Sequence, residues 1–173
     1  MAKYTVMRIR NGSVAFVATE KGVSNVILTG RDPAQARKRL AAEFPEAEYD
    51  ADLLPAFQKQ LRQYLAGKLR SFHVKLDLSA LTAFQRRVLD RCGRIGYGRT
   101  KTYGELAREI GRPKAARAVG GALGSNPVPL VIPCHRVVAG DGSLGGFSAE
   151  QGVSLKRHLL DMESGGAPRR AER

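Results

Sequence analysis

The residues best suited to covalent chemistry are a cysteine and a histidine that stand side by side, Cys134 and His135, in the segment IPCHRV (132–137). Three prolines fall within residues 127–133, so the run that leads to the thiol cannot be helical. Because burial under this apolar run would raise the pKa of a thiol, nucleophilic attack needs a base or a positive charge nearby. His135 and Arg136 could supply either. The alternative is an inert buried cysteine beside a surface histidine, since neighbours on an extended strand point to opposite faces unless the chain turns.

A carboxylate that could complete this pair is Glu163, at the end of a helix expected over 153–163. It lies four residues after Leu159, at the edge of an apolar stripe. An inward carboxylate needs a partner, and His135 is the candidate. The pattern therefore predicts a Cys-His-Glu relay, in which Glu163 orients the imidazole and His135 withdraws the thiol proton directly or through a water. The alternative is a solvated glutamate at a helix end.

The cysteine and histidine content predicts neither a metal site nor a disulfide. The chain has two cysteines and three histidines, without the spacing of metal ligands. The N-terminus lacks the apolar core of a signal peptide, and no apolar run approaches the roughly 20 residues of a membrane span. We therefore expect a cytoplasmic protein with no membrane partner and a free Cys134. Cys92, His73 and His158 are expected to be structural, with His73 in a short strand.

The charge distribution indicates a polyanionic partner. Lysine and arginine number 29 against 16 acidic residues, which gives a formal net charge of +13. Residues 84–136 alone hold 11 basic and 3 acidic side chains. A basic surplus concentrated in one segment is typical of a nucleic-acid-binding face. The alternative is charge that only keeps the protein in solution.

The first 79 residues predict a small α+β domain. Two period-two segments flank the turn sequence Asn11-Gly12, which is typical of a β-hairpin. Asp32 followed by Pro33 is typical of a helix start. The expected elements are strands at 4–10, 13–19 and 23–28 and helices at 33–44 and 53–66.

From Leu78 onward the pattern changes to short helices joined by glycine-bearing turns, and we place the domain boundary near Ser79. The second and third of these helices are separated only by Gly-Arg-Pro, which is a helix-turn-helix pattern. A flexible tail is expected over 165–173. The expected helices are 82–92 with Thr82 as cap, 103–110 with Thr102 as cap, 113–123 opened by Pro113, and 153–163.

The third helix, PKAARAVGGAL, has almost no large side chains. Gly120 and Gly121 together cost roughly 1–2 kcal/mol of helix propensity relative to alanine, so another interaction should compensate. One explanation is close packing against a helix of the same domain. The other is close approach to DNA, with the small helix in a narrow groove and Arg117 projecting into the base stack. The basic surroundings favour the second.

Several of these segments occur together in one known family. The motif PCHRV (133–137), preceded by GSNPVPLVI and RPKAARAVGGAL, closely resembles the O6-alkylguanine-DNA alkyltransferases, also known as methylated-DNA–protein-cysteine methyltransferases. The resemblance is specific over 84–163, whereas before residue 80 only the order of elements is similar. It implies an α+β fold with a small ribonuclease-H-like N-terminal domain (1–79). A mainly helical, winged-helix-like C-terminal domain (80–164) would carry the helix-turn-helix.

Carried over position by position, the resemblance implies that Cys134 accepts the alkyl group and that His135 and Glu163 form a water-linked relay to it. Asn126 would brace the helix-turn-helix against the active-site segment, and the Tyr103 hydroxyl would meet the departing guanine. Arg117 would fill the gap left by a flipped nucleotide. The implied DNA-binding residues are Lys114, Ala115, Ala116, Arg117, Gly120 and Gly121, and the implied substrate pocket contains Tyr103, Val138, Phe147 and Ser148.

The implied reaction is an irreversible transfer, once per molecule and without a cofactor, from O6-alkylguanine or O4-alkylthymine in double-stranded DNA to Cys134 after the base is flipped out. The expected protein is a monomer, able to bind DNA cooperatively and associated with the nucleoid if the source is a prokaryote. Two other functions remain open. A relative that only binds alkylated DNA would lack the cysteine, and a transcription regulator would need a base-reading helix richer in Asn, Gln or Arg.

Two further features bear on the resemblance. The loop GGFSAEQG (145–152) is longer than the corresponding loop of some members, which leaves the range of alkyl adducts open. No cysteine precedes Cys92, and in this respect the chain is similar to the members without zinc.

Overall fold

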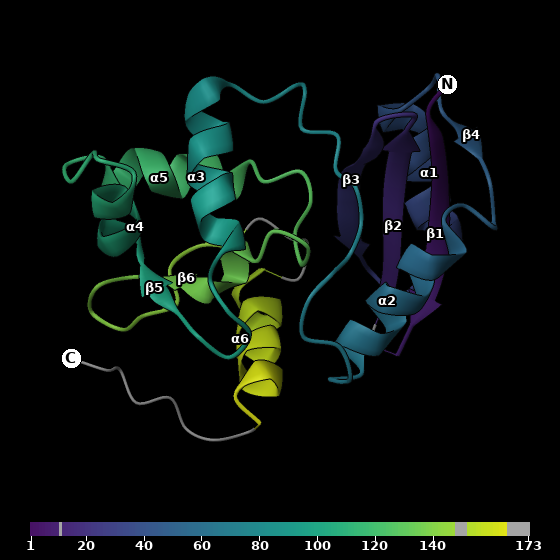
Figure 1. The fold of residues 1–173 in the computed structure, drawn as a ribbon. Helices are drawn as coiled ribbons and strands as arrows, with labels where there is room; N and C mark the ends of the chain where they lie inside the picture. The colour runs from purple at the N-terminus through teal and green to yellow at the C-terminus, as the bar shows by residue number, and fades with distance from the viewer. Residues whose placement is uncertain (11, 148–151, 166–173) are drawn as a thin grey trace. The chain divides into compact units, whose positions relative to one another are not determined.

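The chain divides into two units, Met1–Ala80 and Leu81–Arg173 (Figure 1). The computed structural model describes residues 1–10, 12–147 and 152–165. Helices and strands are mixed along the chain, so the predicted α+β class is confirmed. The expected boundary near Ser79 falls beside the division between the units. Of the expected tail, only Gly165 lies within the described residues.

A four-stranded sheet with the order β3-β2-β1-β4 forms the centre of the N-terminal unit. The first two strands are antiparallel, and the pairing of Ile9 with Gly12 leaves only two residues between them. The predicted hairpin is present, but Gly12 already belongs to β2, so the connection begins one residue earlier than the Asn-Gly sequence predicts. Asn11 itself lies outside the described residues. The elements are β1 (Lys3–Ile9), β2 (Gly12–Thr19), β3 (Gly22–Thr29), α1 (Pro33–Glu43), β4 (Glu48–Tyr49) and α2 (Pro55–Leu65).

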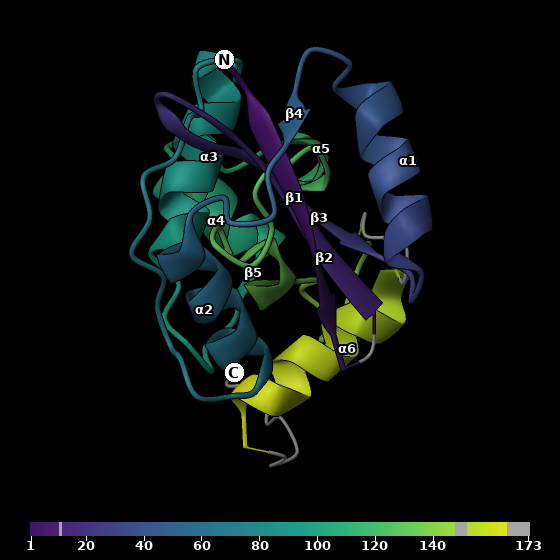
Figure 2. The same ribbon diagram turned by 90° about the vertical axis from the view of Figure 1, so that its right-hand side faces the viewer.

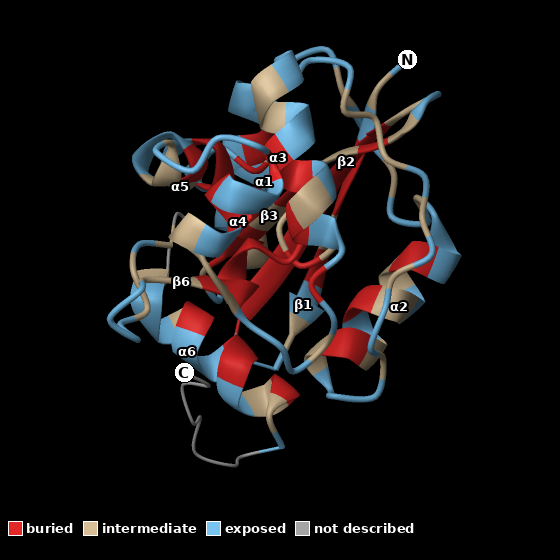
Figure 3. Cartoon of the chain, turned by 60° about the vertical axis from the view of Figure 1, so that its left-hand side comes forward, coloured by how far each residue is buried: buried red, intermediate tan, exposed pale blue. Residues whose placement is uncertain are grey.

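The two helices of this unit cover opposite faces of the sheet (Figure 2). Successive side chains of a strand point to opposite faces. Accordingly, Ala15 and Val17 of β2 pack with Leu40 of α1. Phe16 meets the ring of Phe57 of α2 edge-on, with 4.9 Å between ring centroids. β2 is therefore buried along almost its whole length (Figure 3).

Local signals account for one helix start in this unit and not for the other. α1 begins as predicted, because the Asp32 side chain accepts a hydrogen bond from the Ala34 N–H at 2.9 Å. α2 begins at Pro55 and not at the predicted residue 53, because Leu54 adopts a left-handed φ of 47°. The expected strand at His73 is wrong: its backbone N–H and C=O instead bond to the side chain of Gln60.

Short helices dominate the C-terminal unit, with α3, α4 and α5 grouped together and α6 next to the β5–β6 pair (Figure 1). Thr82 and Thr102 both form capping boxes, with Gln85 and Glu105 respectively. No helix among the described residues is long and apolar enough to span a bilayer. The elements are α3 (Ala83–Gly93), β5 (Lys101–Thr102), α4 (Tyr103–Glu109), α5 (Ala116–Gly124), the 3-10 turn η1 (Cys134–Arg136), β6 (Val137–Val138) and α6 (Gly152–Glu163).

The second helix of the helix-turn-helix starts later than predicted. Pro113 does not open it, because residues 113–115 form a turn that the Ala115 N–H closes on the Arg112 carbonyl at 2.9 Å. The first helical bond runs from the Val119 N–H to the Ala115 carbonyl. Lys114 and Ala115 therefore precede α5 and do not lie within it.

Candidate active site

Cys134 begins the 3-10 turn η1 and does not lie on an extended strand. Its N–H donates to the Ile132 carbonyl at 2.8 Å, and the Arg136 N–H donates to the Pro133 carbonyl at 2.9 Å. The side chains of Cys134, His135 and Arg136 are all buried. Because the chain turns here, the opposite-face restriction of a strand does not apply to the thiol and the imidazole.

Asn126 holds the segment that leads to the thiol. Its Nδ2 donates to the Ile132 carbonyl at 2.9 Å, and its Oδ1 accepts from the Val128 N–H at 3.1 Å. Between these two bonds, Leu130 has a left-handed φ of 72°, which a branched side chain rarely adopts. The Asn126 side chain also acts to lower the pKa of the Cys134 thiol. One buried amide thus connects the end of α5 to the turn that carries the thiol.

Glu163, the last residue of α6, is fully buried and accepts hydrogen bonds at both carboxylate oxygens. His135 Nε2 lies 2.8 Å from its Oε1. Arg136 donates from Nη2 to Oε1 and from Nε to Oε2, each at 2.9 Å, and the Gly98 N–H donates to Oε2 at 3.2 Å. The structure therefore brings the predicted His135–Glu163 pair together. It adds Arg136, which the sequence indicated as a charge near the thiol and which here binds Glu163.

Burial dominates the electrostatics of the site. It raises the pKa of the Cys134 thiol, although the hydrogen bond from Asn126 and the charge of Lys156 act in the opposite direction. Burial likewise lowers the pKa of His135, against the influence of Glu163. A buried thiol and a buried imidazole shifted in these directions are both uncharged near neutral pH. At rest, the imidazole is therefore uncharged and able to accept a proton.

Lys156 is a residue of the site that sequence reasoning missed. Its side chain is 0% exposed, and its Nζ donates to the Val137 carbonyl at 2.6 Å and to the Gly146 carbonyl at 3.3 Å. The same ammonium lies 5.8 Å from the centre of the Tyr103 ring. Lys156 thus joins the strand after the thiol to the loop that precedes α6, and it brings a positive charge close to Cys134.

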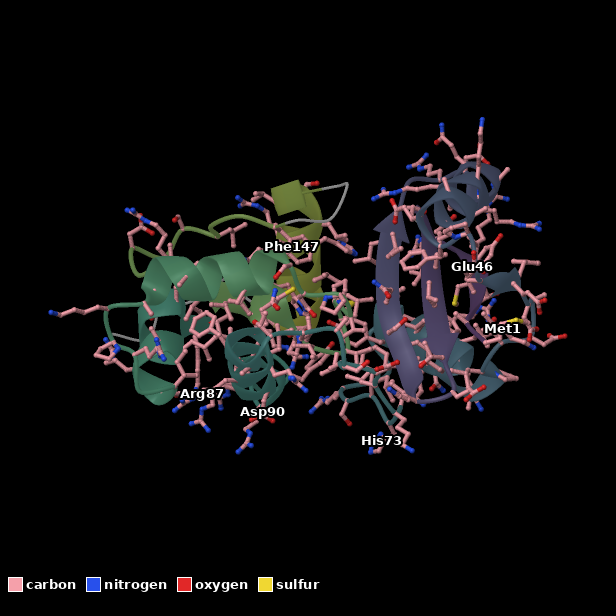
Figure 4. The ribbon with its side chains drawn as sticks, turned by 90° about the horizontal axis from the view of Figure 1, so that it is seen from above. Met1, Glu46, His73, Arg87, Asp90 and Phe147 are labelled. Carbon is pink, nitrogen blue, oxygen red and sulfur yellow. The ribbon has the colours of Figure 1, made fainter. Side chains whose placement is uncertain are left out.

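The thiol lines a pocket of about 460 Å³. Two aromatic side chains, Tyr103 and Phe147, form part of the wall, and Phe147 is labelled in Figure 4. Such a lining suits a flat aromatic ring. The other described lining residues are mostly small and come largely from α5: Ala116, Arg117, Gly120, Leu123, Gly124 and Gly146.

Two of the expected pocket residues, Val138 and Ser148, need separate comment. Val138 is half-buried and pairs with Thr102 in the β5–β6 ladder, and it is not among the described residues that line the pocket. The position of Val138 is therefore fixed by the pairing of β6 with β5. Ser148 lies outside the described residues.

The outer side of α5 is exposed and small. Arg117, Ala118 and Gly121 face solvent, as does Lys114 before the helix, whereas Ala115 and Ala116 are half-buried. A Cβ on Gly121 would meet nothing within 4 Å, and one on Gly120 would make only an ordinary 3.8 Å contact with the Tyr103 ring. Close packing inside the domain therefore does not explain Gly121. No group of three or more potential metal-ligating side chains was found within the part of the chain that the structure describes.

The comparisons with known proteins point to one family. Residues 83–165 match the family model described as the DNA-binding domain of 6-O-methylguanine DNA methyltransferase. A methylated-DNA–protein-cysteine methyltransferase of Mycobacterium bovis is 49% identical over 109 residues, which is 63% of this chain and 64% of the relative. A protein with the same name from Mycolicibacterium paratuberculosis is 36% identical over 160 residues, or 90% of this chain and 95% of the relative.

Solved structures extend the likeness to both units. The crystal structure of the Mycobacterium tuberculosis O6-methylguanine methyltransferase has a TM-score of 0.80 at 34% identity and covers 98% of this chain and 97% of that one. The OGT of Mycobacterium tuberculosis in complex with DNA has a TM-score of 0.80 at 35% identity, with 96% and 95% covered. The fold is that of a two-unit protein whose second unit contains a helix-turn-helix. The site consists of a buried thiol with a neighbouring histidine that is bonded to a buried glutamate. The chain belongs to the methylated-DNA–protein-cysteine methyltransferase family.

Proposed function

We propose that the protein repairs alkylated DNA by transferring the alkyl group from O6 of guanine to its own Cys134, once per molecule. One observation carries this proposal. Cys134 lines a pocket that contains Tyr103 and Phe147, while the neighbouring His135 is bonded to a buried Glu163. A pocket for a flat ring, a nucleophile and a proton acceptor are what the transfer requires. The family to which the chain belongs supports the same activity.

DNA must change shape for this reaction, because the alkyl carbon cannot be reached inside the duplex. The damaged nucleotide is flipped into the pocket at a cost of a few kcal/mol. α5 enters the minor groove with its small exposed face, and Arg117 occupies the gap left in the base stack. The relative solved with DNA supports DNA as the partner.

The chemical step needs no oxidant and no cofactor. His135 takes the proton of Cys134, a bond forms between sulfur and the alkyl carbon, and the bond between that carbon and guanine O6 breaks. The electron pair of the broken bond stays on guanine, which is stabilised by a hydrogen bond or a proton at a ring nitrogen from Tyr103. Burial raises the pKa of Tyr103, which keeps its hydroxyl protonated and able to donate. The product thioether is stable, so the protein is consumed.

We propose several finer points of the function and of the fold in the same way. They include activity on O4-alkylthymine, a monomeric protein that binds double-stranded DNA cooperatively, and location in the cytoplasm. They also include a ribonuclease-H-like first unit and a winged-helix-like second unit. The range of alkyl groups accepted depends on the loop 145–152, of which residues 148–151 lie outside the described part.

Mass spectrometry of the intact protein and of its peptides tests the proposed function. The protein is mixed with a duplex that contains one O6-methylguanine, or with the undamaged duplex as control. We expect one added methyl group per molecule, on the peptide that contains Cys134 and only with the damaged duplex. If no mass is added while the damaged duplex is still bound in preference, the protein recognises damage without transfer and the proposal is wrong.

Gly145→Ala is expected to slow transfer roughly tenfold to a hundredfold by displacing Tyr103. Gly145 has a φ of 67°, and a Cβ there would lie 2.8 Å from the Tyr103 hydroxyl oxygen. The measurement is the single-turnover rate of methyl transfer. Gly142→Ala is the matched control, because Gly142 has a similar φ of 84° and a Cβ there meets nothing within 4 Å. Equal rates for both variants would contradict a role for the Gly145–Tyr103 contact.

Gly121→Ala is expected to have opposite effects on stability and on DNA binding. Alanine should raise the free energy of unfolding by about 0.5–1 kcal/mol, because glycine is the poorer helix former. It should weaken binding to undamaged duplex, because the methyl group stands on the exposed face of α5. Urea denaturation and fluorescence anisotropy measure the two effects. The control is Gly93→Ala in α3, also in open space, which should stabilise the protein without loss of DNA affinity.

A further inference from the structure

Arg136 is the charged residue of the IPCHRV segment that the proposed reaction leaves without a task. We propose that Arg136 is a positioning residue that neutralises Glu163 and thereby keeps His135 an uncharged proton acceptor for Cys134. The inference rests on the proposed function, because it specifies how the relay behind the thiol is held ready.

The ion pair between Arg136 and Glu163 is bidentate. The guanidinium donates from Nε and Nη2 to the two carboxylate oxygens, each at 2.9 Å. Its Nη1 donates to the Ile95 carbonyl at 2.5 Å, and the group lies 5.7 Å from the centre of the Tyr97 ring. The Arg136 side chain is only 7% exposed and that of Glu163 is fully buried. Such a bidentate ion pair fixes the orientation of the carboxylate and places a permanent positive charge beside it.

Glu163 Oε1 is shared between His135 and Arg136. A carboxylate beside a histidine normally favours the imidazolium. Here the full positive charge of a guanidinium already faces the same oxygen, so the carboxylate attracts a proton on His135 less. It still accepts a hydrogen bond from Nε2, which sets the orientation of the ring. Glu163 therefore orients the imidazole without charging it.

The other ionisable groups around His135 do not reverse this balance. α6 contributes Glu163 and Lys156, and the charges of Lys156 and Arg136 both lower the pKa of His135. α3 contributes Cys92, whose pKa is raised by burial, so it carries no charge near neutral pH. Cys134 itself is protonated at rest, because burial raises its pKa. Glu163 is thus the anion of the set, and Arg136 is the cation bonded directly to it.

The direct test is the titration of the His135 imidazole by NMR in proteins that carry Cys134→Ser, without DNA. Arg136→Met should raise the pKa of His135, because the Glu163 charge is no longer balanced. The double variant Arg136→Met/Glu163→Gln should bring it back down, because both charges are gone. Arg157→Met, at an exposed arginine of α6, is the matched control and should leave it unchanged. An unchanged pKa in Arg136→Met would overturn the proposal.

A variant that fails to fold does not stop the test. Arg136→Gln and Arg136→Lys are then compared with Glu163 left in place. Both new side chains carry a donor for the carboxylate, but only lysine carries a positive charge. The pKa of His135 should be higher in Arg136→Gln than in Arg136→Lys, because only lysine balances the charge of Glu163. Equal values in these two proteins would overturn the proposal as surely as the first result.

Transfer by the protein with an intact thiol gives an independent readout. Arg136→Met should move the rate profile to higher pH, with about a tenfold loss for each pH unit below the raised pKa of His135. Arg136→Lys, which keeps a positive charge, should retain the original profile in part. A slower rate with an unmoved profile would mean that Arg136 only supports the fold. If the unmodified protein transfers nothing, the proposed function fails, while the NMR titration still decides the role of Arg136.

Discussion

Replacing Cys134 with alanine is expected to abolish methyl transfer, whereas replacing Cys92 with alanine is expected to leave it intact. Both thiols are buried, so burial alone does not distinguish them. Cys134 lines the pocket, next to His135 and within hydrogen-bonding reach of Asn126. Cys92 is 0% exposed within α3, and burial raises the pKa of its thiol far above the usual range. Only the first can meet a substrate as a thiolate.

The measurement is methyl transfer from a duplex with one O6-methylguanine, followed by mass spectrometry, at equal concentrations of the folded variants. Cys134→Ala should still bind the damaged duplex, because the exposed face of α5 does not depend on the thiol. Residual transfer by Cys134→Ala would require another nucleophile. Loss of transfer in a fully folded Cys92→Ala would mean that the thiols had been assigned wrongly.

Elements defined by local chemistry could be predicted from the sequence. Asp32, Thr82 and Thr102 each cap a helix start at the expected place, because a side chain that accepts from the backbone two or three residues later is a local interaction. Pro113 shows the limit of such signals. Proline fits the first turn of a helix, but it fits a turn before a helix equally well, and the bond between Ala115 and Arg112 decides the case.

The partners of the site residues depend on distant segments and were harder to predict. The place of Glu163 on its helix was enough to predict its pairing with His135. The bidentate contact of Arg136 with Glu163 was not predictable in this way, because it arises where η1 turns the guanidinium inward. Lys156 did leave a signal. It precedes Leu159, Leu160 and Glu163 by three, four and seven residues, so it lies on the buried face of α6. A lysine is rarely buried, so the residue type alone does not predict a place at the site.

Lys156→Met is expected to slow transfer by about tenfold or more near neutral pH and to move the rate profile to higher pH. The charge of Lys156 lowers the pKa of Cys134, so its removal raises that pKa and reduces the thiolate fraction at any pH below it. The rate should therefore recover in part as the pH rises from about 6 to about 9. Single-turnover transfer across this range is the measurement.

Arg157→Met is the control for this prediction, because Arg157 is the neighbouring residue of α6 and is exposed. It should change neither the rate nor the profile. Lys156 also holds Val137 to Gly146, so its loss could slow transfer by loosening the pocket alone. That effect would lower the rate by the same factor at every pH. A uniform loss in Lys156→Met would therefore show that the lysine acts through its two hydrogen bonds and not through its charge on the thiol.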